Sequence, residues 1–200
     1  GVPGALISVV CSNALNRSVK EFGKTDPSEI LQQARNIVID TFSKSGTKVS
    51  DGMDISLCAI NGDKFIFSGA NNPLWIVRNT KLISVEQRRN RATYIGDSVS
   101  LIEYKGCRQP VGLHVRMEDF IQYEVEIQEG DTLYMFTDGF ADQFGGPKGR
   151  KFMYKPFKKL LLDINHYSMP EQGEILKNEF SKWKGDVKQV DDLCIIGFKI

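Results

Sequence analysis

The sequence lacks long apolar runs, has few histidines and carries almost no net charge. No stretch approaches the roughly 20 apolar residues of a membrane-spanning helix, so no membrane segment is predicted. Twenty-six Lys and Arg residues balance 25 Asp and Glu residues, which argues against a large basic surface for nucleic acid. Because His114 and His166 are the only histidines, a histidine-rich metal site is excluded, and any bound metal would need oxygen ligands.

The four cysteines, Cys11, Cys58, Cys107 and Cys194, form no C-x-x-C pair. This spacing excludes a zinc ribbon and a thioredoxin-type redox motif. Cys58 and Cys194 lie in apolar runs and are interpreted as small buried hydrophobic residues. Reduced thiols favour a cytoplasmic location.

The 200 residues, 41% apolar and 26% charged, have the composition of a globular domain with its own core. The chain opens with the apolar segment GVPGALISVVC, and neither a start Met nor a basic region precedes it. A signal peptide requires that basic region, so none is expected. A segment this apolar is typical of a domain interior, and we therefore expect the 200 residues to be the C-terminal part of a longer protein.

Hydrophobic periodicity predicts helices near both ends of the sequence. A first helix from Ala5 to Phe22 is apolar nearly all round in its first half and is expected to be buried. A second begins at Pro27 and ends at Gly46. Two more are predicted for 155–164 and 170–183. The apolar stripe of the second helix consists of Ile30, Leu31, Ala34, Ile37, Val38, Thr41 and Phe42.

Between these helices the apolar period changes to that of strands. An Asn61-Gly62 turn joins the first two strands as a hairpin. The closing strand is apolar on both faces and is expected at the centre of a sheet, whereas 86–110 is polar and irregular. Helices grouped around hairpin-connected strands indicate an α+β fold with antiparallel sheets. The predicted strands are Met53–Ile60, Lys64–Ser68, Pro73–Arg78, Leu82–Val85, Phe120–Ile127, Thr132–Phe136 (joined to the preceding strand across Glu129-Gly130-Asp131) and Leu193–Ile200.

Two acidic positions border apolar strands. Asp138 follows the strand that ends in Thr137, and the pair Asp191-Asp192 precedes the closing strand. If these strands are antiparallel neighbours, the acids meet at one edge of the sheet. Clustered carboxylates repel one another unless a cation neutralises them, and such ligands select Mg²⁺ or Mn²⁺. The alternative is that these residues are ordinary turn and cap aspartates.

Several motifs together resemble one protein family. GVPGALISVV, SGANNPLWIVR, Pro110-Val111-Gly112, GDTLYMFTDGFADQFGG and QVDDLCIIGFKI are similar to the SpoIIE/RsbU-type branch of the metal-dependent (PPM, type-2C) protein phosphatases. The resemblance covers 1–200 as a single phosphatase domain, and 86–109, the least similar stretch, is a candidate insertion. It implies a four-layer αββα sandwich of two antiparallel sheets flanked by helices, missing its first strands.

The resemblance also implies a binuclear Mn²⁺ or Mg²⁺ centre, whose activated water hydrolyses phosphoserine or phosphothreonine without a phosphoenzyme. Asp138 matches the family's TDG aspartate and Asp191 its late acidic ligand. Asp192 is expected to orient the loop or a water, or to act as a ligand. Asp142 resembles a position that helps to hold a third metal, and Asp51 could complete that site or serve in a turn.

One part of the family pattern is absent. In the family, a D-x-T/S-G-H segment precedes the equivalent of Gly1, and its Asp bridges both metals. The resemblance therefore implies weak or single metal occupancy and little activity for these 200 residues alone. It also implies exposed sheet edges, which favour self-association.

The resemblance implies a bacterial signalling phosphatase whose substrate is a phosphorylated anti-sigma-factor antagonist, with a sensor domain upstream in the same chain. The first alternative is a catalytically degenerate phosphatase fold that binds or signals without turnover. The second is a metal-dependent phosphoesterase for small molecules. The loop Gly145–Gly149 is either a flap that contacts the substrate or a solvated turn.

Overall fold

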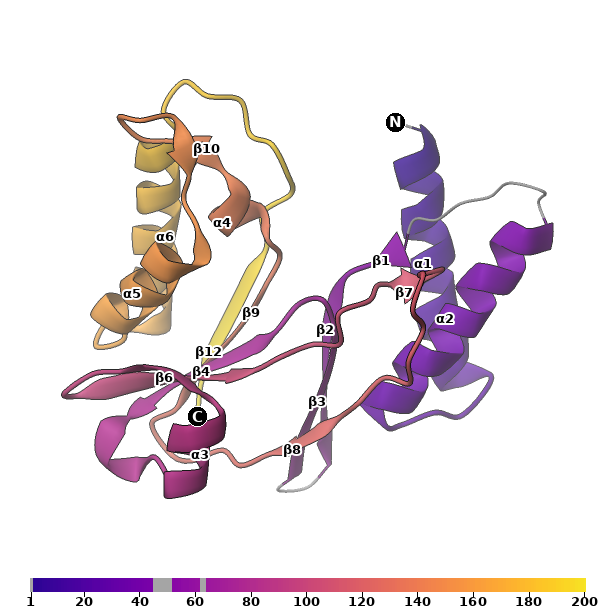
Figure 1. Ribbon diagram of the computed structural model, residues 1–200, viewed down its shortest axis with the longest axis horizontal. Coiled ribbons are helices and arrows are strands. Elements are labelled where there is room, and N and C mark those ends of the chain that lie inside the picture. The colour runs from indigo at the N-terminus through magenta and orange to yellow at the C-terminus, as the bar shows by residue number, and fades with distance from the viewer. Residues whose placement is uncertain (1, 45–51, 62–63) are drawn as a thin grey trace. The chain divides into compact units, whose positions relative to one another are not determined.

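The computed structural model describes three stretches of the chain, and the chain forms two compact units (Figure 1). The described residues are 2–44, 52–61 and 64–200. The expected helix end at Gly46, the turn glycine Gly62 and the candidate ligand Asp51 lie outside them. The first unit comprises Gly1–Leu74 and Tyr104–Glu126, and the second comprises Trp75–Glu103 and Ile127–Ile200.

The first unit contains two helices and an antiparallel sheet of order β2-β3-β8. The β2–β3 hairpin confirms the prediction made from Asn61-Gly62. The predicted strand Phe120–Ile127 is shortened to β8, which pairs with β3 and not with β9. In this pairing the buried side chains of Phe65 and Val125 lie opposite each other. The elements are α1 (Val2–Lys20), α2 (Pro27–Lys44), β1 (Gly52–Met53), β2 (Ile55–Asn61), β3 (Lys64–Ala70), β7 (Val111–Gly112) and β8 (Tyr123–Val125).

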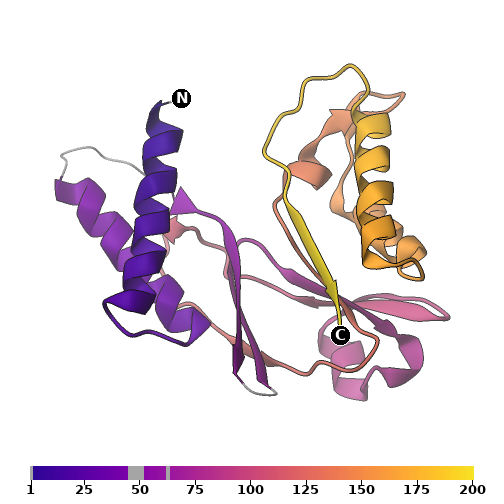
Figure 2. The ribbon, with the colours of Figure 1, turned by 180° about the vertical axis from the view of Figure 1, so that it is seen from behind.

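Helix α1 packs beside α2 in both views of the ribbon (Figures 1 and 2). Cys11 and Ala14 are buried against the apolar stripe of α2. The expectation that the first half of α1 is buried is wrong, since Leu6 is 54% and Val9 67% exposed. The reason is geometric: α1 packs on α2 and β1 with one face, and its other faces stay exposed, however apolar they are. No helix within 2–44, 52–61 and 64–200 combines the length and apolar character needed to cross a membrane.

The predicted stripe of α2 is confirmed at six of its seven positions. Thr41 is the exception: it is exposed, and its hydroxyl donates a hydrogen bond to the Ile37 carbonyl oxygen at 2.7 Å. A threonine hydroxyl on a helix can hydrogen-bond to a carbonyl oxygen of the preceding turn, so this polar side chain need not face the core. The buried positions are Ile30, Leu31, Ala34, Ile37, Val38 and Phe42.

The second unit is built on a five-stranded sheet of order β12-β9-β4-β6-β5. Trp75, Phe136 and Phe157 form the centre of its core, with ring centroids 4.3–5.5 Å apart. The α+β class with antiparallel sheets is thereby confirmed. The elements are β4 (Leu74–Asn79), a 3₁₀ turn η1 (Thr80–Leu82), α3 (Val85–Asn90), β5 (Ala92–Ile95), β6 (Val99–Tyr104), β9 (Thr132–Phe136), α4 (Gly139–Asp142), β10 (Phe144–Gly145), β11 (Arg150–Lys151), α5 (Tyr154–Ile164), α6 (Met169–Lys184) and β12 (Ile195–Lys199).

Two expectations about 82–110 are wrong. Most of the stretch 86–110 is not irregular, because 86–104 forms most of α3 and all of β5 and β6, and the predicted strand Leu82–Val85 is instead the end of η1 and the start of α3. A capping box between Ser84 and Gln87 begins that helix. In it, the Ser84 hydroxyl accepts from the Gln87 N–H at 3.1 Å.

The closing strand is at the edge of the sheet and not at its centre. Ile196 is 52% exposed, and Cys194, expected to be buried, is exposed as well. Apolar residues on both sides of a strand show that both faces favour burial, but they do not determine which strands pair with it. By contrast, Cys58 is half-buried, and desolvation raises the pKa of its thiol to about 12.

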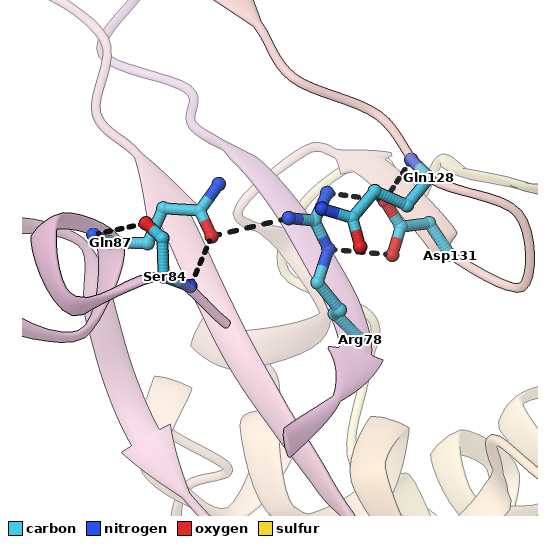
Figure 3. Close-up of polar contacts among 5 residues, drawn as sticks. All are labelled: Arg78, Ser84, Gln87, Gln128 and Asp131. Atoms are coloured by element: carbon cyan, nitrogen blue, oxygen red, sulfur yellow. Dashed lines mark hydrogen bonds and ion pairs between the residues drawn. The ribbon is translucent and has the colours of Figure 1, made fainter. Parts of the chain in front are cut away.

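A buried ion pair joins β4 to the turn before β9 (Figure 3). Arg78 is 0% and Asp131 1% exposed, and the two form a bidentate pair with N–O distances of 2.6 and 2.8 Å. Arg78 also donates to the Gln87 side-chain oxygen at 3.2 Å, and Asp131 accepts from the Gln128 backbone N–H at 2.9 Å. These partners compensate for the desolvation of both charges and attach α3 to the sheet.

Replacing Arg78 with Met should destabilise the second unit by about 3–5 kcal/mol, because Asp131 would stay buried without its counter-charge. Both tryptophans of the chain, Trp75 and Trp183, lie in this unit, so urea unfolding followed by tryptophan fluorescence measures the change. The double variant Arg78→Met/Asp131→Leu should recover much of the loss. Lys182→Met, which removes an exposed ion pair 4.0 Å from Glu179, should cost under about 1 kcal/mol. Equal losses for Arg78→Met and Lys182→Met would contradict this account.

The β10–β11 hairpin is held against Trp183 at the end of α6. The Gly146 N–H donates to the Trp183 carbonyl oxygen at 2.8 Å, and the Trp183 indole N–H donates to the Gln143 carbonyl oxygen at 2.9 Å. A Cβ at Gly145 would overlap the Trp183 carbonyl oxygen. Glycine is required at this position because the two backbones approach too closely for any side chain.

The variant Gly145→Ala should therefore lose about 1–3 kcal/mol of stability, since the hairpin must move off Trp183. Gly173→Ala is a matched control in α6, where an added methyl group meets nothing within 4 Å. That control should gain up to about 1 kcal/mol from helix propensity. Thermal unfolding of the two variants measures both effects. A Gly145→Ala protein as stable as the wild type would show that the hairpin is not fixed by this contact.

Candidate metal centre

Strands β9 and β12 pair antiparallel, as the sequence predicts. Phe136 lies opposite Ile195, and Thr132 lies opposite Lys199. The end of β9 therefore meets the start of β12, and Asp138 follows the one while Asp191-Asp192 precedes the other. The predicted approach of these two acidic segments is confirmed at the level of the backbone.

Thr137 fixes the junction between the two segments. Its hydroxyl donates to the Asp192 carbonyl oxygen at 2.8 Å and accepts from the Cys194 N–H at 3.0 Å. Its own N–H donates to the Cys194 carbonyl oxygen at 3.0 Å. Gly139 allows the same close approach, because a Cβ there would overlap the Asp192 carbonyl oxygen. Thr137 and Gly139, which flank Asp138, are therefore explained by the close contact between the two segments.

The acids at this edge differ in exposure. Asp138 is half-buried at the N-terminus of α4, and its side chain makes no capping hydrogen bond to that helix. Asp191 and Asp192 are exposed. One Asp191 carboxylate oxygen accepts from the Asp192 backbone N–H at 2.8 Å, which orders the dipeptide locally. The carboxylates of Asp191 and Asp192 are therefore accessible to a ligand from solvent.

Asp142 has a different environment from the other acids. Its carboxylate lies 2.8 Å from the ammonium group of Lys151, with both side chains about 40% exposed. Because Lys151 supplies the positive charge here, a cation at Asp142 would have to compete with this ion pair.

The kind of donor at this edge fits a hard divalent cation. Asp138, Asp191 and Asp192 offer only carboxylate oxygens, which Mg²⁺ and Mn²⁺ prefer. Within residues 2–44, 52–61 and 64–200, however, no three His, Cys, Asp or Glu side chains gather into a metal-binding group. The described residues therefore match such a cation in chemistry but supply an incomplete set of ligands.

Sequence reasoning missed two residues at this site, Thr137 and Gln143. Gln143 follows Asp142 directly and is 0% exposed. Neither residue is ionisable, so a search for chemistry-bearing side chains passes over both. The available signal is their position, since they immediately flank the segment that contains Asp138 and Asp142.

Comparisons with known proteins show the family and the fold of the chain. A family model described as "Stage II sporulation protein E (SpoIIE)" matches residues 1–200. The PP2C domain of SiaA from Pseudomonas aeruginosa is 27% identical with a TM-score of 0.79, and the match covers 100% of this chain and 71% of that one. A comparison with curated protein sequences gives no match.

Two further solved structures are similar in fold. The PP2C phosphatase domain with a fragment of the regulatory domain of SpoIIE from Bacillus subtilis is 15% identical, with a TM-score of 0.65 over 98% of this chain and 49% of that one. The PPM Ser-Thr phosphatase MsPP from Mycobacterium smegmatis, in complex with cacodylate, is 11% identical, with a TM-score of 0.57 over 100% and 84%. The chain thus spans about half of that SpoIIE structure. The fold of the chain is similar to that of PP2C phosphatase domains. Because the family model matches residues 1–200, the chain belongs to the SpoIIE family.

Proposed function

We propose that this protein is a metal-dependent phosphatase that hydrolyses phosphoserine or phosphothreonine on a signalling protein. The observation that carries the proposal is the pairing of β9 with β12, which brings Asp138 and Asp191-Asp192 to one sheet edge. Membership of the SpoIIE family and the fold shared with PP2C phosphatase domains support it.

In this proposal Asp138 and Asp191 hold Mn²⁺ or Mg²⁺, and Asp192 orients the loop or a bound water. Asp142 is a candidate for a further cation once Lys151 is displaced. Bound at Asp138 and Asp191, the cation would lower the pKa of a water. The oxygen of that water would bond to phosphorus as the bond between phosphorus and the serine or threonine oxygen breaks. The carboxylates at this edge keep the cation in place, and the side-chain alcohol leaves with a proton. No side chain of the protein needs to become phosphorylated.

The substrate class follows by family analogy. We propose a phosphorylated anti-sigma-factor antagonist as the substrate and a sensor domain in the same polypeptide as the source of the signal. The B. subtilis SpoIIE structure, which contains a fragment of a regulatory domain, supports such an arrangement.

Replacing Asp138 or Asp191 with Asn in the full-length protein should abolish Mn²⁺-dependent hydrolysis of a phosphoserine peptide. Each substitution removes a negative charge and an oxygen ligand but keeps the size of the side chain. The loss of rate should exceed the roughly 100-fold that removal of an outer-shell partner causes. Release of inorganic phosphate measures the rate, and titration with Mn²⁺ measures the affinity.

Asp163→Asn is the matched control for both variants. Asp163 is an exposed acid on α5 in the same unit, and the same chemical change there should leave the rate within about twofold of wild type, as expected of a surface site. Wild-type rates in Asp138→Asn and Asp191→Asn would refute the proposed site. An inert wild type would refute the proposed enzyme.

A second candidate function is a phosphatase fold that binds phosphoproteins without turnover. The observation that favours it is the incomplete ligand set, because residues 2–44, 52–61 and 64–200 gather no group of three metal-binding side chains. The two functions differ in one measurement. A binding module would bind a phosphoserine peptide but would release no inorganic phosphate from it at any Mn²⁺ concentration.

A further inference from the structure

We propose that Gln143 is a positioning residue, which holds the segment before Asp191 against the segment that contains Asp138. This inference deepens the proposed function and rests on it. Gln143 touches neither a substrate nor a metal in this scheme. Its amide group sets where the second acid stands relative to the first.

The side-chain amide of Gln143 connects two parts of the chain that are distant in sequence. It is 0% exposed. Its nitrogen donates to the Phe144 carbonyl oxygen at 2.9 Å and to the Lys188 carbonyl oxygen at 3.2 Å. Its oxygen accepts from the Val190 N–H at 3.3 Å. Both N–H donors and the oxygen are thus engaged, and two of the three bonds reach the segment that leads into Asp191.

That segment depends on such contacts because it has no helix or strand of its own. Residues 185–194 run from the end of α6 to the start of β12 as a loop, drawn in yellow in Figures 1 and 2. Gln143 binds this loop at Lys188 and Val190, and Thr137 binds it at Asp192 and Cys194. The loop is therefore held on both sides of Asp191. Both residues that hold it, Thr137 and Gln143, belong to the segment 137–143 that contains Asp138.

The backbone of Gln143 is itself fixed, so the side chain starts from a defined position. Its carbonyl oxygen accepts from the Trp183 indole N–H at 2.9 Å and from the Phe152 N–H at 3.0 Å. The loop has no helix or strand of its own to hold it at this edge. A loop without these anchors would relax away from Asp138, and a metal would then have to bring it back at a cost in affinity.

The test is Gln143→Met in the full-length protein, because methionine matches glutamine in length but makes none of these hydrogen bonds. Without metal, amide hydrogen exchange in residues 186–192 should become at least about tenfold faster, as local opening becomes easier. Mn²⁺ affinity, measured by titration without substrate, should fall by about 10–100-fold. At saturating Mn²⁺, kcat should recover while KM for the phosphopeptide stays unchanged.

Gln172→Met is the matched control. Gln172 is also buried in the second unit at 1% exposure, and its amide donates to the Tyr167 carbonyl oxygen and accepts from the Tyr134 hydroxyl. The same substitution there removes buried hydrogen bonds at a distance from the acidic loop. It should lower stability but leave Mn²⁺ affinity and exchange in 186–192 unchanged. Gln143→Asn, one methylene shorter, should shift both quantities in the same direction as Gln143→Met and serves if the latter does not fold.

The inference is overturned if Gln143→Met and Gln143→Asn weaken Mn²⁺ binding no more than Gln172→Met, or leave exchange in 186–192 unchanged. Failure of the proposed function has a different signature. In that case Asp138→Asn and Asp191→Asn would also leave Mn²⁺ affinity at the wild-type value. Loss of affinity in the Asp variants without loss in the Gln143 variants would refute the positioning role alone.

Discussion

The pairing of β9 with β12 is the constraint from which the candidate site follows. Side chains alternate between faces along a strand, so a slip of one residue would turn every side chain of β12 to the other face. Bonds at both ends oppose such a slip. At one end the Ile200 N–H donates to the Asp131 carbonyl oxygen at 2.9 Å, and at the other the Cys194 N–H donates to the Thr137 hydroxyl. The position of Asp191 relative to Asp138 is a consequence of this register.

The same pairing connects the buried ion pair to the site without direct contact. Asp131 stands at the start of β9 and is fixed by Arg78, while Asp138 stands just beyond its end. The charged pair is fully buried and makes further hydrogen bonds to Gln87 and Gln128, whereas Asp191 and Asp192 are exposed. Structural charges and candidate functional charges thus occupy opposite ends of one strand and contrasting environments.

Much of the second unit could be predicted from the sequence because its signals are local. The amphipathic period of α5 and α6, the apolar run of β9 and the acids beside it specify elements and their ends. The edge position of β12 could not be predicted, since apolar residues on both faces say nothing about which strands flank them. The order in 86–104 was missed for a related reason: a four-residue edge strand, β5, and a capped six-residue helix carry little periodicity.

The candidate site divides in the same way. Asp138 and Asp191 can be found from sequence because a carboxylate beside an apolar strand is conspicuous. Thr137 and Gln143 cannot, because their roles depend on backbone atoms of residues that only folding brings near. Asp191 and Asp192, which are exposed, are accessible to a ligand, whereas the groups of Thr137 and Gln143 that hold the loop are engaged in hydrogen bonds. Gln143 has no exposed surface and both of its amide atoms are engaged, and its place beside the acidic loop is what a preformed site requires.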